Sequence, residues 1–332
     1  MTSINNLNAW LFARAMDLDS ATPGLAGLLF RCSNERRHVI AAYLSMQRPH
    51  FSFVNDAALG CFLMHAGHRE ILQATFNTVP EGLRGALRRA GARSHPRRFY
   101  PYVHALLSSE SRTETKALIP LLKRVTPSSL ATARALPDDL RSAALVRVLG
   151  SAENARDVAG LVALLSEADV DRVAMCRALA ATESMQNVIE FAGKWSFRAK
   201  LPGHPVPRAD FYIPVEHAGE LKRLAIGYRN CLRNLLANAL DGRAAFAVVK
   251  HNDEEAIVHL IHHRGQWALH EVCGPDNRLP DSALYEVATR YLHAQGIQKR
   301  SRSRSADSKW MPLRRLAGRE AHQIEIDEVL LG

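Results

Sequence analysis

The spacing of the apolar residues changes at Gly242, and this change limits which folds the chain can adopt. Over residues 221–240, apolar side chains recur at steps of three and four, which predicts an amphipathic helix. Gly242 then favours the left-handed backbone with which many helices end. Beyond it, alternating apolar residues predict three strands, over 245–250, 256–263 and 266–273. The short polar turns between these strands predict an antiparallel meander.

Residues 1–198 are patterned as one helix after another. The predicted helices cover 8–16, 23–30, 33–46, 55–65, 69–77, 114–125, 127–136, 138–150, 153–166, 168–181 and 184–195. Breaks rich in Ser, Thr, Asp and Pro separate the later ones, as is typical of helix starts. No repeat of fixed period is present, so we expect a helical domain that is either a bundle or an irregular α-solenoid.

Prolines over 199–215 predict an extended connector into a second domain, residues 216–332. After the meander, this domain is expected to hold a loop over 274–280, a helix over 281–293 and a last strand over 322–330. The predicted fold class is therefore α+β, a mostly helical N-terminal domain followed by helices on an antiparallel β-meander.

Alternation along the third strand assigns side chains to the two faces of the sheet. It places Trp267, Leu269, Glu271 and Cys273 on one face, and Ala268, His270 and Val272 on the other. A carboxylate in the more apolar set must be hydrogen-bonded, paired or protonated, which makes Glu271 a candidate active-site acid. Alternatively, it caps the backbone of the Gly274 loop or pairs with an arginine.

The second domain resembles a known family over roughly residues 203–295. The matching positions are Pro205, Val206, Pro207, Ile213, Pro214, Asn230, Cys231, Gly242, Gly274, Asn277 and Pro280. This pattern is similar to the PcfJ-like proteins, which are known from conjugative plasmids and other bacterial mobile or accessory DNA. The chain departs from the pattern at Leu235, where the family has an aromatic residue, and at Glu271, where it has Gln. A position that accepts Gln or Glu implies hydrogen bonding more than acid–base catalysis. The resemblance implies no settled activity.

Charge favours a polyanionic partner. The net charge is +10 and the pI is near 9.7, which points to DNA or RNA. No acidic residue lies between Glu81 and Glu110, and a first set of phosphate-binding candidates lies there: Arg84, Arg88, Arg89, Arg93, Arg97 and Arg98. The aromatic residues that follow, 99–104, either stack on bases or belong to the core.

A second basic set begins in the 274–280 loop. Its candidates are Arg278, Lys299, Arg300, Arg302, Arg304, Arg314 and Arg315, with Trp310 close by for stacking. In the loop itself, Asn277 either donates with Arg278 to a phosphate or base edge, or caps the following helix.

Few residues suggest catalysis. The candidates are Glu271, His270, Cys231 and Asn277. Several histidines and Cys273 crowd the meander, but strand alternation separates them between the two faces, so no metal site and no cofactor is predicted. The sequence contains no P-loop, Rossmann, H-E-x-x-H or G-x-S-x-G motif, which counts against the enzyme classes that use them.

The predicted function is that of a nucleic-acid-binding accessory protein of a bacterial mobile or accessory DNA element. The alternatives are a nuclease-like hydrolase centred on Glu271 and Asn277, and a protein-interaction module that uses the helical domain. Five dispersed cysteines without C-x-x-C suit a reducing cytosol. No signal peptide or membrane-spanning run is evident, so we expect a cytoplasmic location and no membrane partner.

Overall fold

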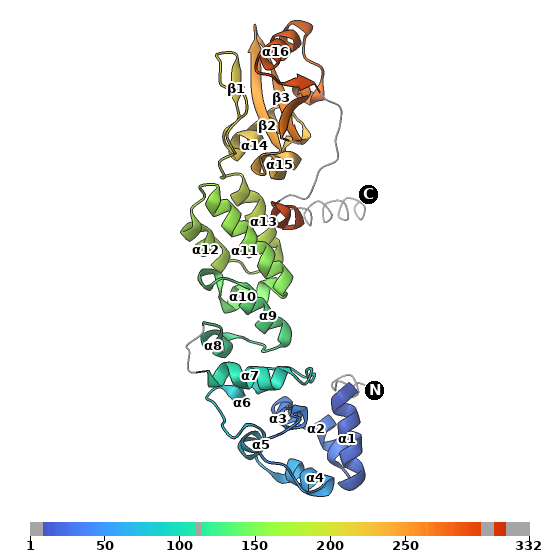
Figure 1. The fold of residues 1–332 in the computed structure, drawn as a ribbon. Coiled ribbons are helices and arrows are strands. Elements are labelled where there is room, and N and C mark those ends of the chain that lie inside the picture. Colours follow the sequence, from blue (N-terminus) through green and yellow to red (C-terminus); the bar gives the residue numbers. More distant parts are fainter. Residues whose placement is uncertain (1–8, 110–113, 264, 300–308, 317–332) are drawn as a thin grey trace, which may run out of the picture. The chain divides into compact units, whose positions relative to one another are not determined.

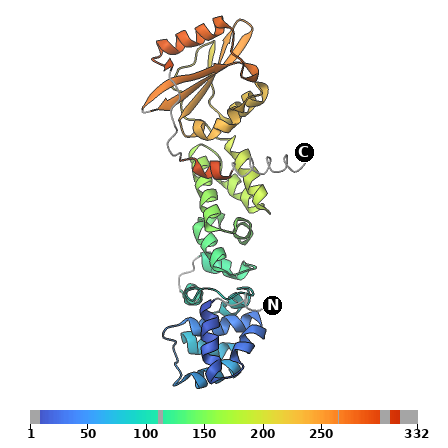
Figure 2. The same cartoon turned by 90° about the vertical axis from the view of Figure 1, so that its right-hand side faces the viewer.

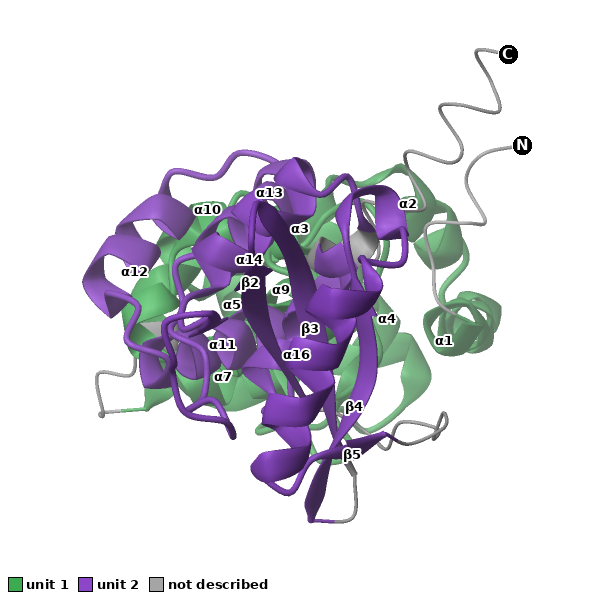
Figure 3. Cartoon of the chain, turned by 90° about the horizontal axis from the view of Figure 1, so that it is seen from above, with its two compact units in different colours: residues 1–155 green, residues 156–332 purple. Residues whose placement is uncertain are grey.

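A computed structural model describes residues 9–109, 114–263, 265–299 and 309–316. The chain is α+β, with helices first and then a small, mainly antiparallel sheet with helices, as predicted (Figure 1). It divides into two compact units, residues 1–155 and 156–332 (Figure 3). The division into domains at residue 198 stays a prediction. In the described ranges, every helix is too short or too polar to cross a membrane.

Unit 1 is helical throughout its described residues. Its elements are α1 (Ala9–Ala21), α2 (Leu25–Arg31), α3 (Asn34–Ser45), α4 (Asp56–His65), α5 (His68–Phe76), α6 (Leu83–Arg88), α7 (Phe99–Ser108), α8 (Glu114–Leu118), η2 (Ile119–Leu121), α9 (Pro127–Ala135), η3 (Asp138–Leu140) and α10 (Ala143–Leu149). Side-chain caps mark the starts of some of these helices. The Ser33 hydroxyl accepts the Arg36 amide at the start of α3, and Thr126 caps α9 ahead of Pro127.

The middle of α3 forms the centre of the unit 1 core, and α3 contacts α5, α6 and α7. Among its buried residues is Arg37, which is 4% exposed. The Arg37 guanidinium donates to the carbonyls of Leu29 (3.0 Å) and Ala92 (2.8 Å). Carbonyl oxygens at the end of α2 and in the 89–98 loop therefore satisfy this buried charge, which joins the two segments.

Unit 2 begins within α11 (Ala152–Glu167) and continues with α12 (Arg172–Ala180) and α13 (Met185–Ser196). The helix predicted over 221–240 is broken into α14 (Ala218–Gly227), η4 (Cys231–Leu235) and α15 (Leu236–Leu240). Arg229 takes a left-handed φ of 49°, and the Asn230 side chain accepts the Leu232 amide. An asparagine side chain that bonds a nearby backbone amide competes with the helix, and this explains the break. Gly242 has the expected positive φ, 68°.

Within the described residues, the sheet has five strands in the order β1 (Tyr212–Pro214), β2 (Ala244–His251), β3 (Glu254–His263), β4 (Gln266–Cys273) and β5 (Gln298–Lys299). The predicted meander forms β2 to β4. The proline-rich connector adds β1 antiparallel to β2, and β5 pairs parallel with β4. The strand predicted over 322–330 lies outside the described residues.

Helices cover both faces of this sheet. On one face, α16 (Ser282–Ala294) contacts β2, β3 and β4, whereas α15 contacts β2 from the other face and is itself in contact with α14 (Figure 2). The core under α16 includes Val258, Leu260, Leu269 and Val272. Asp281 caps α16 by accepting the Ser282 amide, so the interpretation of Asn277 as this cap is wrong.

Strand β4 contains a β-bulge. His259 pairs with Glu271, but the next residue of β3, Leu260, pairs with Leu269, which leaves His270 as an extra residue. Leu269 and Val272 are three positions apart, yet both lie in the core under α16. The predicted assignment of β4 side chains to faces is therefore wrong beyond Leu269, because a bulge shifts the alternation by one residue.

A short helical segment, 311–316, packs against the helices of unit 2. Trp310 is 2% exposed, so its ring belongs to the core and is not available for stacking on a base. The Arg315 guanidinium forms an ion pair with the buried Asp157 carboxylate at 2.8 Å, and Arg314 donates to the Asn238 side chain. Both arginines thus anchor the segment.

Replacing Arg315 with Ala is expected to lower the free energy of unfolding by about 2 kcal/mol, because Asp157 stays buried without this partner. Arg290→Ala is the matched control, since its partner Glu286 is exposed and such surface pairs contribute less than about 0.5 kcal/mol. Urea unfolding of both variants measures the difference. Equal losses would contradict the anchoring role.

Candidate functional site

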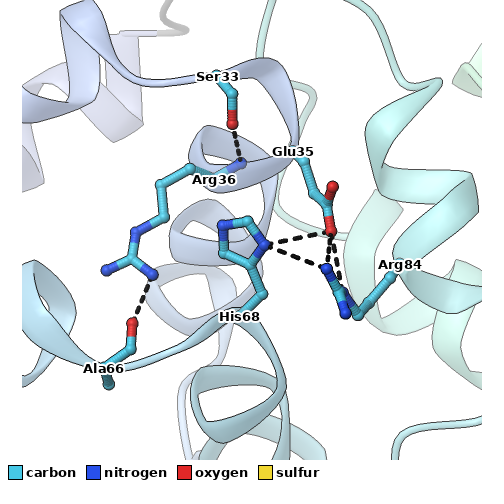
Figure 4. Close-up of polar contacts among 6 residues, drawn as sticks. All are labelled: Ser33, Glu35, Arg36, Ala66, His68 and Arg84. Atoms are coloured by element: carbon cyan, nitrogen blue, oxygen red, sulfur yellow. Dashed lines mark hydrogen bonds and ion pairs between the residues drawn. The ribbon is translucent and has the colours of Figure 1, made fainter.

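The arginine-rich segment 84–98 contains arginines of two kinds. Some are used by the fold. Arg84 pairs with the half-buried Glu35 at 2.8 Å, and His68 contacts the same carboxylate at 3.2 Å (Figure 4). Arg89 is half-buried and donates to the Ile119 carbonyl at 3.1 Å. The guanidinium groups of Arg84 and Arg89 are therefore engaged in contacts within the protein.

The other arginines of this segment, Arg88, Arg93, Arg97 and Arg98, are exposed. Lys123 and Arg124 are further exposed cations on a segment in contact with this one, and Arg147, also exposed, lines the same groove as Lys123 and Arg124. We call these seven residues the basic surface. No carboxylate among the described residues forms an ion pair with any of them.

Contacts within unit 1 bring the segments of the basic surface together. The Val125 amide donates to the Arg89 carbonyl at 3.0 Å, and the Arg124 guanidinium lies against Gly91. Arg97 lies over the Trp10 ring, 5.1 Å from its centre. The 89–98 loop therefore adjoins segment 122–126, although about 30 residues separate them in sequence. Lys123 and Arg124 lie outside the arginine-rich run in the sequence, so the charge pattern of that run does not reveal them.

A groove of about 690 Å³ continues the basic surface between η2 and the helices α9 and α10. Its lining combines the cations Lys123, Arg124 and Arg147 with the hydroxyl groups of residues 126, 128 and 129. Apolar side chains complete it, among them Leu121, which is 67% exposed. Such a groove suits a ligand that has both anionic and apolar parts.

A buried hydrogen-bond network holds the 89–98 loop. The His95 amide donates to the Tyr100 hydroxyl (3.1 Å), and this hydroxyl lies 3.1 Å from Nδ1 of His38. Nε2 of His38 is 2.9 Å from the Gly91 carbonyl, which can only accept, so neutral His38 carries its proton there. Burial lowers the pKa of His38 from its usual 6.5 to about 4. The network is complete when His38 is neutral.

Most of the aromatic residues that follow the loop are structural. Phe99 and Tyr100 are 4% and 1% exposed and belong to the core. The His104 ring stacks on Phe76 with centroids 4.1 Å apart. Tyr102 is 40% exposed and is the member of this group that a base can reach. The alternative in which these aromatics form core holds for Phe99 and Tyr100.

The second basic set is less coherent in the described residues. Arg278 is exposed in the 274–280 loop, and Lys299 donates to the Tyr285 hydroxyl at 3.2 Å. Arg314 and Arg315 are engaged with Asn238 and Asp157, as described above. Arg300, Arg302 and Arg304 lie outside the described residues.

A polar cluster forms at the bulge of β4. His259 is 6% exposed, and its Nδ1 lies 3.3 Å from a Glu271 carboxylate oxygen. The His270 ring meets the His259 ring edge to face, with centroids 4.8 Å apart. On its other side, His259 stacks on the buried Phe246 ring at 4.7 Å. The prediction that alternation separates His270 from Glu271 is wrong, since the bulge brings both beside His259.

The other catalytic candidates are not shown to join this cluster. Asn277 is exposed in the 274–280 loop and has a φ of 58°. Cys231 lies in η4, and its side chain is outside the described part of the structure. Tyr228 is buried nearby, and burial, followed by the Glu255 carboxylate, raises its pKa, so it stays protonated.

Comparison with known proteins gives no external guide to these sites. The chain matches no protein-family model, no curated protein and no solved structure. Membership of the PcfJ-like family therefore stays a prediction.

Acid is expected to destabilise unit 1 through His38. Its folded pKa of about 4 lies below the usual 6.5, so the unfolded chain binds the proton first and stability falls from pH 6.5 to pH 4. The loss from this group approaches about 3 kcal/mol. Urea unfolding across this range is expected to give a flatter pH profile for His38→Gln than for the natural chain. Part of the slope will remain, because burial also lowers the pKa of His95. Identical slopes would contradict this account.

Proposed function

We propose that this chain is a nucleic-acid-binding protein that contacts phosphates through the basic surface of unit 1. The observation that carries the proposal is that seven exposed cations, from segments joined by direct contacts or by a shared groove, have no described carboxylate as a partner. Exposed cations placed in this way are the electrostatic footprint of polyanion binding. The context that the PcfJ-like resemblance implies, a bacterial mobile or accessory DNA element, is part of the proposal.

The distribution of charge along the chain supports this location. Residues 1–155 contain 19 of the 43 Lys and Arg residues but 11 of the 33 Asp and Glu residues. Residues 156–332 contain the remaining 24 and 22, which nearly balance. Most of the net positive charge therefore belongs to the unit that holds the basic surface. We place the principal contact there, with the second basic set as a supplementary one.

The mode of binding follows from the side chains available. Arginines give bidentate contacts to phosphate oxygens, and these contacts carry no sequence information. With Tyr102 as the exposed aromatic of its group, stacking adds little. We therefore expect binding that depends strongly on salt and weakly on sequence.

The triple variant Arg93→Gln, Arg97→Gln, Arg98→Gln is expected to weaken binding to a labelled duplex. For every phosphate that the variant no longer neutralises, the slope of log affinity against log salt falls by about 1. Fluorescence anisotropy over a salt series, with single- and double-stranded DNA and RNA, measures both affinity and slope.

The control carries the same change in net charge elsewhere. The variant Arg177→Gln, Arg223→Gln, Arg290→Gln removes three exposed arginines of unit 2. It is expected to retain nearly the natural slope. Equal losses of affinity in the two triple variants would mean that net charge alone governs binding. Dissociation constants above about 1 mM for all four polymers at low salt would reject the proposed function.

A further inference from the structure

The polar cluster at the bulge of β4 brings together side-chain types that bind metal ions. Potential ligand atoms of His259, His270 and Glu271 all lie within 4.8 Å of one another. Two of them, His259 Nδ1 and a Glu271 oxygen, are 3.3 Å apart. Two ligands bound tetrahedrally to Zn²⁺ at about 2.0–2.1 Å are separated by about 3.4 Å. This pair therefore already has the spacing of two zinc ligands.

The three side chains of the cluster differ in how far the protein encloses them. His259 is fixed between the Phe246 ring and the His270 ring. His270 is half-buried and the Glu271 side chain is 53% exposed, so both are less enclosed than His259. An enclosed first ligand reduces the ordering needed on binding.

The donor types select the class of metal. Imidazole nitrogens suit Zn²⁺, Cu²⁺, Ni²⁺ and Fe²⁺, whereas Mg²⁺ and Ca²⁺ require mostly oxygen ligands. Two histidines and one carboxylate make three protein ligands, which leaves a fourth position of a tetrahedral ion for water or a substrate. Glu271, the most exposed of the three, gives the site access to solvent.

We propose that His259, His270 and Glu271 bind a divalent transition-metal ion, with Zn²⁺ as the expected occupant, in an open three-ligand site. The competing account is that His259 and Glu271 form a hydrogen bond that satisfies two polar groups on the sheet and binds nothing. This proposal does not depend on nucleic-acid binding by unit 1.

The test uses the full chain without a histidine tag, freed of metal with a chelator and dialysed. Titration calorimetry with Zn²⁺ is expected to give one site with a Kd below about 1 µM. Co²⁺ in its place is expected to produce the visible absorption of a four- or five-coordinate ion. Zn²⁺ should also raise the melting temperature, because it binds the folded chain.

Variants distinguish the cluster from other histidines and thiols. His270→Ala and Glu271→Gln are expected to weaken Zn²⁺ binding by about 100-fold or more, exceeding the effect of removing a supporting group. His262→Ala is the matched control, because His262 is exposed on the same strand as His259 and packs on Trp267 instead. His259→Ala does not test metal binding, since removing a buried ring can unfold the sheet.

Clear results would overturn the proposal. They are a Kd weaker than about 100 µM for the natural chain, or Zn²⁺ affinities of His270→Ala and Glu271→Gln equal to that of His262→Ala. Melting curves of the metal-free variants verify that each one is folded. Because no nucleic acid is present, either outcome leaves the test of the basic surface unaffected.

Discussion

Helices cover both faces of the sheet in unit 2, and the arrangement of its polar residues depends on this constraint. Where a strand packs against apolar residues, each polar side chain on it needs a partner or a path to solvent. The bulge at His270 meets this need, because it returns Val272 to the core under α16 and turns His270 and Glu271 toward His259. The same residue that preserves the core thus assembles the polar cluster.

In unit 1, too, buried polar side chains bond to partners within the protein, and here they hold the 89–98 loop. Arg37 and His38 are adjacent on α3, both buried, and both bond to carbonyls of the 89–98 loop. The Tyr100 hydroxyl completes the network from α7. The loop backbone that carries these arginines is therefore fixed by hydrogen bonds to buried side chains. A held backbone reduces the conformational entropy cost when these side chains meet an anion.

The sequence predicts the elements of this fold better than its sites. Apolar spacing and cap residues locate most helices and the meander, since these signals are local. The apolar spacing misses the break at Arg229 because the side chain of Asn230 competes with the helix. It misses the bulge because the pairing of His259 with Glu271 is not local. Segment 122–126 adjoins Gly91 through tertiary contacts, so its cations could not be assigned to the first arginine set.

The ways in which this chain uses arginine argue for a functional basic surface. Where an arginine serves the fold, it has a partner: Arg37 bonds to carbonyls, Arg84 to Glu35 and Arg315 to Asp157. The seven cations of the basic surface have no such acceptor among the described residues, although Arg97 lies over Trp10. Like charges gathered without acids destabilise the compact state through mutual repulsion. A purely structural role for the basic surface does not compensate for this repulsion, whereas an anionic ligand would offset it on binding.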